Sequence, residues 1–414
     1  MPDLHLPLEK LPPSVTRLYV AFSSGIDSCV LLHRLLNQSH HCSVILWHIN
    51  HGLQDNAGQM QQLAADLALE YNLQIRIDHL NLTPDQGNLE AVARAARYDL
   101  FSAALTEQDA LLTAHHMNDQ AETLMLNLMR GSGAAGLRAI ADITTLGEGY
   151  LLRPLLDFNR AEIEQYARRY DLKWVEDPSN QSLQYDRNYI RHQVLPGLVQ
   201  RWPGVIQQLH RASGWQAEQQ QLLEQLAQID FEHCSREHRF SSIPCLAISA
   251  LTQLSTARQK NLIRYWIAGN EKPQLGVKPL YQLLGQIKED ASAMTRIQSA
   301  GYSLRYYDGL LFLTDDVDEK EQELSEQYQV TDGKPLQISQ LCLTVTRQQL
   351  LEYLQLADSG QQLSLRFRSG QLNRVDPSRH RLKRLFQQHR VPPWLRQRVA
   401  QIYVDEKLVD LLLL

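Results

Sequence analysis

The fold of this chain is decided by the stretch Tyr19-Val20-Ala21-Phe22-Ser23-Ser24-Gly25-Ile26-Asp27-Ser28-Cys29-Val30-Leu31-Leu32. An apolar run typical of a buried strand leads into a short loop of Ser and Gly, and a run with helical spacing follows at once. The first N–H groups of such a helix have no partner inside the helix, and the helix dipole adds partial positive charge there. We therefore predict that the loop 23–28 binds phosphate. The alternative is a plain strand-to-helix turn in which Asp27 or Ser28 only caps the helix.

Three more apolar runs predict strands at 43–49, 73–78 and 109–114, and helical patterns at 59–71 and 89–105 separate them. Strands and helices that alternate in this way predict a parallel sheet with helices on both faces and right-handed crossovers. The predicted fold class is therefore α/β with a doubly wound parallel sheet. Ligands of such sheets bind outside the carboxyl ends of the strands, where the polar loops of this chain fall.

A chain of 414 residues is long enough for two or three domains. We predict a catalytic domain at 1–195, a mainly helical domain at 196–325 and a small basic α+β domain at 326–414. No apolar run approaches the roughly 18 residues that span a bilayer, and no secretory signal is visible, so we expect a cytoplasmic protein without a membrane partner. The five cysteines are scattered and form no CxxC pair, which suggests neither disulfides nor a zinc site.

Two carboxylates follow the fourth predicted strand. Asp119 and Glu122 lie one turn apart at the start of a helical pattern. One interpretation is a capping box, with Asp119 as the N-cap and Glu122 at the third helical position. The other is a pair of carboxylates directed across the sheet edge at the first loop, where they can hold Mg2+ or an amine.

Two other stretches invite a functional interpretation. The second predicted strand leads into Asn50-His51-Gly52-Leu53, and its backbone can offer hydrogen bonds to an adenine ring. For His51 itself a loop histidine without chemistry is the better explanation than a catalytic one. The run 131–136 matches the pattern GxGxxG but follows a helix instead of a strand, so we interpret it as a helix end and a flexible loop.

Positive charge is concentrated near the C-terminus, although the formal net charge of the chain is −5. The segment from Arg366 to Arg398 contains ten Arg and Lys residues and only one acid, Asp376. The aromatic residues Phe367, Phe386 and Trp394 lie among them. Such a patch attracts phosphate backbones and predicts RNA binding; the alternative is a basic face that only aids solubility. Arg94 and Arg97 either contact phosphate or belong to a solvated helix face.

The loop 23–28 resembles the SGGxDS loop of the N-type ATP pyrophosphatases, the PP-loop enzymes, and the motifs together resemble the tRNA(Ile)-lysidine synthetases of that superfamily. The other stretches that carry the resemblance are Asn50-His51-Gly52-Leu53, Arg94-Ala95-Ala96-Arg97-Tyr98, Thr113-Ala114-His115-His116, Asp119-Gln120-Ala121-Glu122-Thr123, Arg130-Gly131-Ser132-Gly133, Arg153-Pro154-Leu155-Leu156, Glu176-Asp177-Pro178-Ser179-Asn180, Arg187-Asn188-Tyr189-Ile190-Arg191, Leu382-Lys383-Arg384-Leu385-Phe386 and Val391-Pro392-Pro393-Trp394-Leu395-Arg396.

The resemblance implies a ligase. ATP adenylates the C2 oxygen of the wobble cytidine in isoleucine tRNA with a CAU anticodon, and the ε-amine of free L-lysine displaces AMP to give lysidine. ATP and Mg2+ are the implied cofactors. The implied residues are, for catalysis, Asp27, Asp119 and Glu122; for the metal, Asp27 and Asp119; for ATP, Ser23, Ser24, Gly25, Ile26, Asp27, Ser28, His48 and Asn50; for tRNA, Arg94, Arg97, Arg191, Arg366, Arg368, Lys383, Arg384 and Arg396.

The chain departs from the family pattern at two positions. Ser24 replaces a Gly, and we expect its φ to be negative because a Cβ is poorly tolerated at positive φ. Asn118 stands where the family commonly has Asp. Two rival functions are another PP-loop tRNA-modifying enzyme, such as a thiolating one, and a non-catalytic tRNA-binding protein that responds to nucleotide. The sequence leaves the oligomeric state open, with a homodimer as one option.

Overall fold

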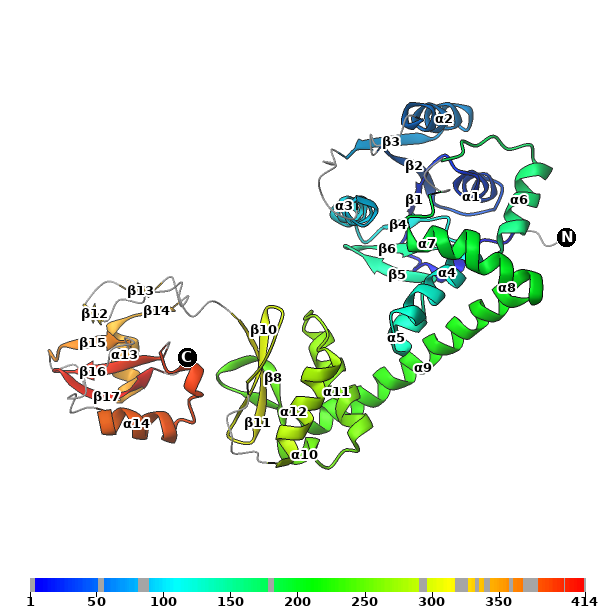
Figure 1. Ribbon diagram of the computed structural model, residues 1–414. Helices are drawn as coiled ribbons and strands as arrows, with labels where there is room; N and C mark the ends of the chain where they lie inside the picture. Colours follow the sequence, from blue (N-terminus) through cyan, green and yellow to red (C-terminus); the bar gives the residue numbers. More distant parts are fainter. Residues whose placement is uncertain are drawn as a thin grey trace. The chain divides into compact units, whose positions relative to one another are not determined.

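The computed structural model describes residues 4–50, 56–80, 89–177, 182–289, 296–316, 327–331, 335–338, 343–356, 360–367, 379–397 and 399–412 (Figure 1). The chain divides into two compact units, Met1–Leu222 and Leu223–Leu414. The finer boundaries at 195 and 325 stay predictions. Among the described helices, none is long and apolar enough to cross a membrane.

The first unit is built on a six-stranded sheet in the order β3-β2-β1-β4-β6-β5. All neighbouring pairs are parallel except β5 with β6, which is antiparallel. The prediction of a parallel α/β sheet is confirmed. Its strands are β1 (Arg17–Ala21), β2 (Ser43–Asn50), β3 (Gln74–His79), β4 (Asp109–Leu112), β5 (Ile143–Leu146) and β6 (Gly149–Leu152).

Apolar side chains alternate between two cores, one on each face of this sheet. Leu18 and Val20 of β1 belong to the core that α1 and α6 cover, whereas Tyr19 of the same strand packs in the core beneath α3. The helices of the unit are η1 (Leu8–Lys10), α1 (Ile26–Leu36), α2 (Ala57–Glu70), α3 (Leu89–Ala104), α4 (Met117–Met129), α5 (Ala134–Leu137), α6 (Arg160–Arg169), α7 (Asp186–Tyr189), the π-helical turn η3 (Ile190–Val194), α8 (Leu195–Arg201) and the first part of α9 (Val205–Cys234).

The order of the strands in the sheet creates a crevice for a ligand. Chain order reverses between β1 and β4, which are neighbours in the sheet, so the loops after these two strands diverge and leave a crevice at their carboxyl ends. Gly131 has φ 69° just after the end of α4, which confirms the predicted helix end. The short helix α5 occupies the second half of the GxGxxG-like run.

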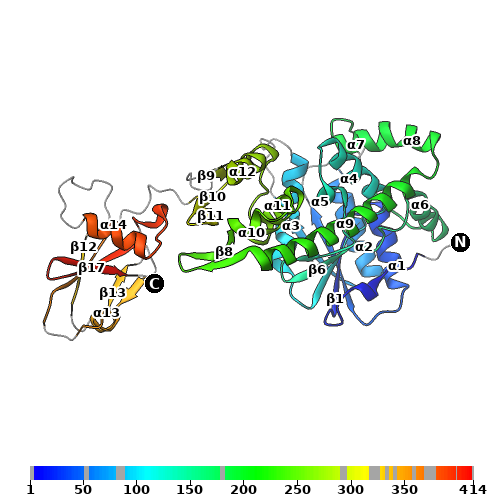
Figure 2. The ribbon, with the colours of Figure 1, turned by 90° about the horizontal axis from the view of Figure 1, so that it is seen from below.

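The second unit joins helices to antiparallel sheets, and Figure 2 shows α9 leading into it as one continuous helix. A five-stranded sheet has the order β7-β8-β11-β10-β9. Its elements are β7 (Ser235–His238), β8 (Ser241–Ala247), α10 (Ile248–Leu251), α11 (Thr256–Gly269), α12 (Val277–Glu289), β9 (Arg296–Ser299), β10 (Tyr302–Tyr307) and β11 (Leu310–Asp315).

The last part of the chain forms a four-stranded antiparallel sheet, β12-β15-β16-β17, with the short pair β13-β14 and two helices. This mixture agrees with the predicted α+β class. The elements are β12 (Gln327–Val330), β13 (Leu336–Ile338), β14 (Leu343–Val345), α13 (Arg347–Leu354), β15 (Leu363–Arg366), α14 (Arg379–Gln388), η5 (Pro393–Leu395), β16 (Ala400–Val404) and β17 (Lys407–Leu412).

The expected backbone conformation of Ser24 is wrong. Ser24 has φ 63°, in the left-handed region, and its side chain is fully buried. The hydroxyl Oγ donates to the carbonyl oxygen of Met60 at 2.6 Å, which ties the loop to α2. A buried hydrogen bond therefore offsets the conformational cost of roughly 1–2 kcal/mol that a Cβ brings at positive φ.

This pairing predicts that Ser24→Ala and Ser24→Gly differ. Ser24→Ala loses the hydrogen bond and keeps the strained backbone, so the free energy of unfolding should fall by about 1–2 kcal/mol. Ser24→Gly also loses the bond but relieves the strain, so its loss should be about half as large. The urea midpoint of the transition of the first unit measures both. Exposed Ser23→Ala is the control, and equal losses for Gly and Ala would contradict the account.

Candidate active site

The loop after β1 presents the start of α1 to the crevice. Gly25 is the N-cap of α1, and no side chain caps this helix end. Ser28 Oγ donates to the carbonyl oxygen of Gly25 at 2.8 Å, so Ser28 does not serve as the cap. The alternative in which Asp27 or Ser28 only caps the helix is therefore wrong. N–H groups at a helix start without a side-chain cap suit the phosphates of ATP.

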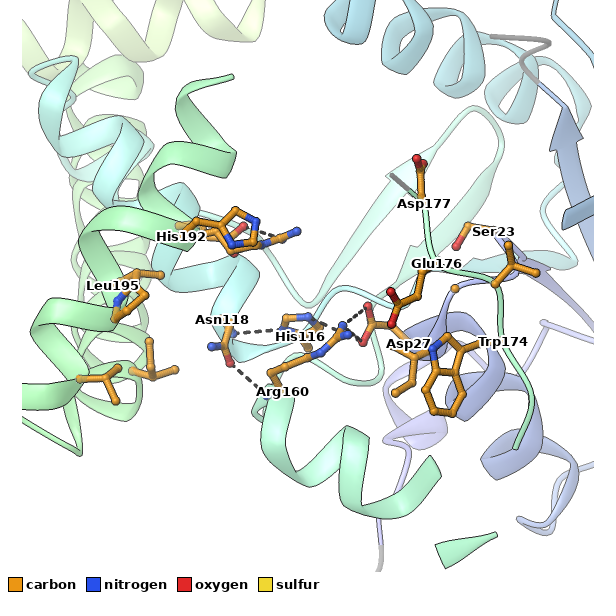
Figure 3. A pocket seen from close by; sticks show the side chains of 18 of the residues that line it. Ser23, Asp27, His116, Asn118, Arg160, Trp174, Glu176, Asp177, His192 and Leu195 are labelled. Atoms are coloured by element: carbon orange, nitrogen blue, oxygen red, sulfur yellow. Dashed lines mark hydrogen bonds and ion pairs between the residues drawn. The ribbon is translucent and has the colours of Figure 1, made fainter. Parts of the chain in front are cut away.

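A cavity of about 700 Å3 lies at the carboxyl ends of β1 and β4. Its volume is in the range of small-molecule sites. Figure 3 shows that side chains from α1, α4 and α6 converge on it, with residues 174–177 on one side and α8 on the other. The lining residues are Ser23, Gly25, Ile26, Asp27, Met60, His116, Asn118, Glu122, Arg160, Trp174, Val175, Glu176, Asp177, Arg191, His192, Leu195, Pro196, Val199 and Ile206.

Asp27 is the carboxylate of the loop after β1, and Arg160 holds it. The terminal nitrogen Nη1 of Arg160 donates to both carboxylate oxygens, at 2.8 and 2.9 Å. His116 Nε2 lies 3.8 Å from Asp27 Oδ1. Burial raises the pKa of Asp27, although His116 and Arg160 act against that rise. The charged form of Asp27 therefore depends on these cationic or donating neighbours.

His116, and not Asp119, is the N-cap of α4, so the predicted cap residue is wrong. The ring nitrogen Nδ1 of His116 accepts a hydrogen bond from the backbone N–H of Asn118 at 3.2 Å. The backbone N–H of His116 donates to Asp119 Oδ2 at 2.9 Å. Because Nδ1 is an acceptor, this hydrogen-bond pattern assigns the proton of the neutral ring to Nε2. Nε2 lies 3.6 Å from Asp119 and so stands between two carboxylates.

Two arginines neutralise the acidic pair. Arg187 lies 2.8 Å from Asp119 Oδ1 and 2.8 Å from Glu122 Oε2. Arg191 donates to both oxygens of Glu122, at 2.6 and 2.9 Å, and lies 3.1 Å from Asp119. Glu122 is only 1 % exposed, so its charge needs these partners. Burial alone would raise the pKa of Asp119, but His116 and Arg187 hold it below its usual range.

Asn118 binds the start of a second helix, α6, whose N-cap is Asn159. The side-chain Oδ1 of Asn118 accepts from the backbone N–H of Arg160, the first residue of α6, at 3.0 Å. An amide oxygen fills this role as well as a carboxylate oxygen would. Asn118 thus joins the start of α4 to the start of α6. It holds the backbone of Arg160, the residue whose side chain contacts Asp27.

The residues predicted for adenine have structural partners. His48 is buried, and its Nδ1 lies 2.9 Å from the carbonyl oxygen of Phe22. Burial lowers the pKa of His48, which keeps the ring neutral. Asn50 Nδ2 donates to Gln61 Oε1 at 2.9 Å. His51 and the two residues after it lie outside the described residues.

Some of the residues predicted to bind tRNA are exposed, and others already contact residues of the protein. Lys383 and Arg384 are exposed on α14, and Arg384 borders a hollow of about 790 Å3. Arg366 forms an ion pair with Glu406 and lies 4.2 Å over the Tyr403 ring. Arg368 falls outside the described residues.

Three other cations on the tRNA list also have partners. Arg396 donates to the carbonyl oxygen of Val391 and lies over the Phe386 ring. Arg94 is exposed and lies 5.0 Å over the Tyr98 ring, whereas Arg97 is half-buried. Arg191, described above, is bound by the acidic pair.

His116, Arg160 and Arg187 belong to the site but are not among the residues predicted for it. The i,i+4 spacing of Arg187 and Arg191 was a signal, because it places two cations on one helix face, as Asp119 and Glu122 share another. No sequence signal links Arg160 to Asp27, since 133 residues separate them.

Cys29 lies next to the loop but cannot supply a reactive thiolate. Burial raises its pKa to about 12. The four described cysteines, Cys29, Cys42, Cys234 and Cys245, are all free thiols.

The fold and the loop define an ATP-using enzyme of the PP-loop class, and a PP-loop domain model matches residues 5–198. A TilS substrate binding domain model matches 246–312, and a TilS substrate C-terminal domain model matches 363–411. The tRNA(Ile)-lysidine synthase of Serratia proteamaculans is 36% identical over 95% of this chain and 89% of its own length. That of Coxiella burnetii is 34% identical over 94% and 87%. This chain belongs to the tRNA(Ile)-lysidine synthase family.

The environment of Asp119 predicts a pH-dependent contribution to stability. Its folded-state pKa is lower than the ordinary value of 3.8, so the carboxylate stabilises the fold above that pH and loses the contribution as the pH falls below it. Asp119→Asn should lower the free energy of unfolding of the first unit by about 1–3 kcal/mol at pH 7. The difference from wild type should shrink below about pH 4 in urea titrations.

The matched control is Asp99→Asn, which changes an exposed carboxylate on α3. It should leave the unfolding free energy within about 0.5 kcal/mol of wild type at neutral and at acidic pH. A deficit for Asp119→Asn that stays the same between pH 7 and about pH 2.5 would contradict the proposed charge pairing.

Proposed function

We propose that this enzyme uses ATP to join the ε-amine of free L-lysine to C2 of the wobble cytidine in isoleucine tRNA with a CAU anticodon. The C2 oxygen attacks the α-phosphate of ATP and pyrophosphate leaves; the lysine amine then attacks C2, loses a proton, and AMP leaves with the oxygen. The observation that carries the proposal is the meeting of an uncapped helix start with three carboxylates at the β1–β4 crevice.

The loop after β1 holds the triphosphate in this proposal. Backbone N–H groups at the start of α1 point at the phosphates, and the helix dipole stabilises the charge that develops on the leaving pyrophosphate. Asp27 is the carboxylate that would hold Mg2+, which neutralises the charge of the phosphate oxygens when bound. Among the described residues no group of three or more His, Cys, Asp or Glu side chains could hold a metal. Phosphate oxygens and water complete such a site.

Asp119 and Glu122 hold the lysine side chain. Their buried carboxylates attract an ammonium group, which would share them with Arg187 and Arg191. Because its pKa is lowered, Asp119 is a weak base and serves mainly as an anchor. His116 is not the base, since its Nδ1 is occupied by a backbone N–H and its Nε2 carries a proton. Glu122, the other carboxylate of the pair, takes the proton that turns the bound ammonium into the attacking amine, and the second proton leaves to water as the C–N bond forms.

Lysine transfer is the direct test. The protein is incubated with ATP, Mg2+, labelled lysine and unmodified CAU-anticodon isoleucine tRNA, with methionine tRNA as the substrate control. Label should enter the isoleucine tRNA alone, with release of AMP. Glu122→Gln should lower the rate at least about 100-fold, because it removes one charge from the amine site. Exposed Glu148→Gln, in the turn between β5 and β6, should retain the wild-type rate.

Two outcomes would sink the proposal. Tight tRNA binding without label or AMP would favour a non-catalytic tRNA-binding protein. Release of AMP while no labelled lysine enters any tRNA would favour another PP-loop modification of tRNA.

The basic helix α14 predicts a second result. Lys383→Ala with Arg384→Ala should weaken tRNA binding at least about tenfold and reduce the salt dependence by one to two phosphate contacts. Arg366→Gln is the matched control, since Arg366 is already paired with Glu406 and should affect tRNA affinity less. Filter binding from 50 to 300 mM salt measures both. An equal loss of tRNA affinity in the two variants would show that exposed residues of α14 are no more important for RNA binding than the paired Arg366.

A further inference from the structure

Arg160 is the one guanidinium that contacts the carboxylate of the phosphate loop in the described part of the crevice. Its Nη1 donates to both carboxylate oxygens of Asp27 (Figure 3). Its Nε donates to Glu164 Oε1 at 2.9 Å. The Arg160 side chain is 41% exposed and lines the cavity. The guanidinium is therefore anchored at one end and turned toward the ligand space at the other.

The pairing conflicts with the use of the site. Asp27 lies in the first turn of α1, beside the N–H groups that suit phosphate, and its charge repels a phosphate placed there. A cation that takes Asp27 must replace the contact that Arg160 makes. Arg160 would then face the negatively charged ligand with a free Nη1.

We propose that Arg160 is a counterion that changes partner: it holds Asp27 through Nη1 and turns to the pyrophosphate part of ATP when the nucleotide binds. The anchor at Glu164 allows this, because the contact at Nε can persist while Nη1 moves. Asn118 keeps the start of α6 in place throughout, since it binds the backbone and not the side chain of Arg160. The inference rests on the proposed function and adds a pyrophosphate-binding residue to it.

The geometry distinguishes this role from a structural one. If Arg160 only held the loop together, loss of either partner would weaken ligand binding. If Arg160 changes partner, loss of Asp27 releases the guanidinium and strengthens the binding of metal-free pyrophosphate, whereas loss of Arg160 weakens it. The two variants should therefore act in opposite directions.

A double-mutant cycle with the full-length protein and inorganic pyrophosphate tests this, by calorimetry without Mg2+. Asp27→Asn should raise the affinity about tenfold when Arg160 is present, and by no more than about threefold in the Arg160→Gln background. The residual gain reflects only the lost repulsion. Arg160→Gln alone should lower the affinity about tenfold, and Arg160→Lys should retain most of it because the charge remains.

Arg168→Gln is the matched control. It removes an exposed arginine from the same helix, which also lies near Glu164, and should leave the pyrophosphate affinity unchanged. An equal gain from Asp27→Asn in both backgrounds, or a loss in both, would overturn the role of Arg160 and leave the proposed function intact. If the wild-type protein binds neither pyrophosphate nor ATP in the presence of Mg2+, both proposals fail.

Discussion

Three carboxylates lie close together in a largely buried crevice, and the arrangement of the first unit depends on neutralising them. Asp27, Asp119 and Glu122 repel one another, and burial makes each charge costly. His116 stands between the first two, and arginines from later segments complete the balance. Loss of one partner of a buried pair typically costs about 3–5 kcal/mol, so these ion pairs constrain how the segments after the sheet pack.

The source of the arginines shows how the site is assembled. Asp27 and the acidic pair follow β1 and β4, the two strands at which the sheet order reverses. Arg160 begins α6, and Arg187 and Arg191 belong to α7 and the π-helical turn after it. The sheet alone therefore presents the carboxylates, and the helices that follow it supply the opposite charge. A ligand that brings its own cations or anions can exchange with these pairs, which links the stability of the site to its chemistry.

Part of this was predictable from local pattern. Apolar runs of strand length separated by helical periods predicted the parallel sheet, and the polar stretch after the first strand predicted the turn that begins α1, because both depend on neighbours in sequence. The expected φ of Ser24 and the alternative in which Asp119 caps α4 are wrong for the same reason. The φ of Ser24 is maintained by a hydrogen bond to Met60 on another helix, and the cap of α4 is an imidazole that also faces Asp27.

The sequence by itself determined the α/β class, the order of the first strands, the place of the loop and the concentration of basic residues near the C-terminus. These follow from periodicity and charge, which are local properties. Only the tertiary structure decided which charges meet. Arg160 reaches Asp27 across 133 residues, and Arg366 is paired with Glu406 while Lys383 and Arg384 remain exposed. Electrostatic partners depend on distances that folding creates, and residue spacing along the chain does not encode them.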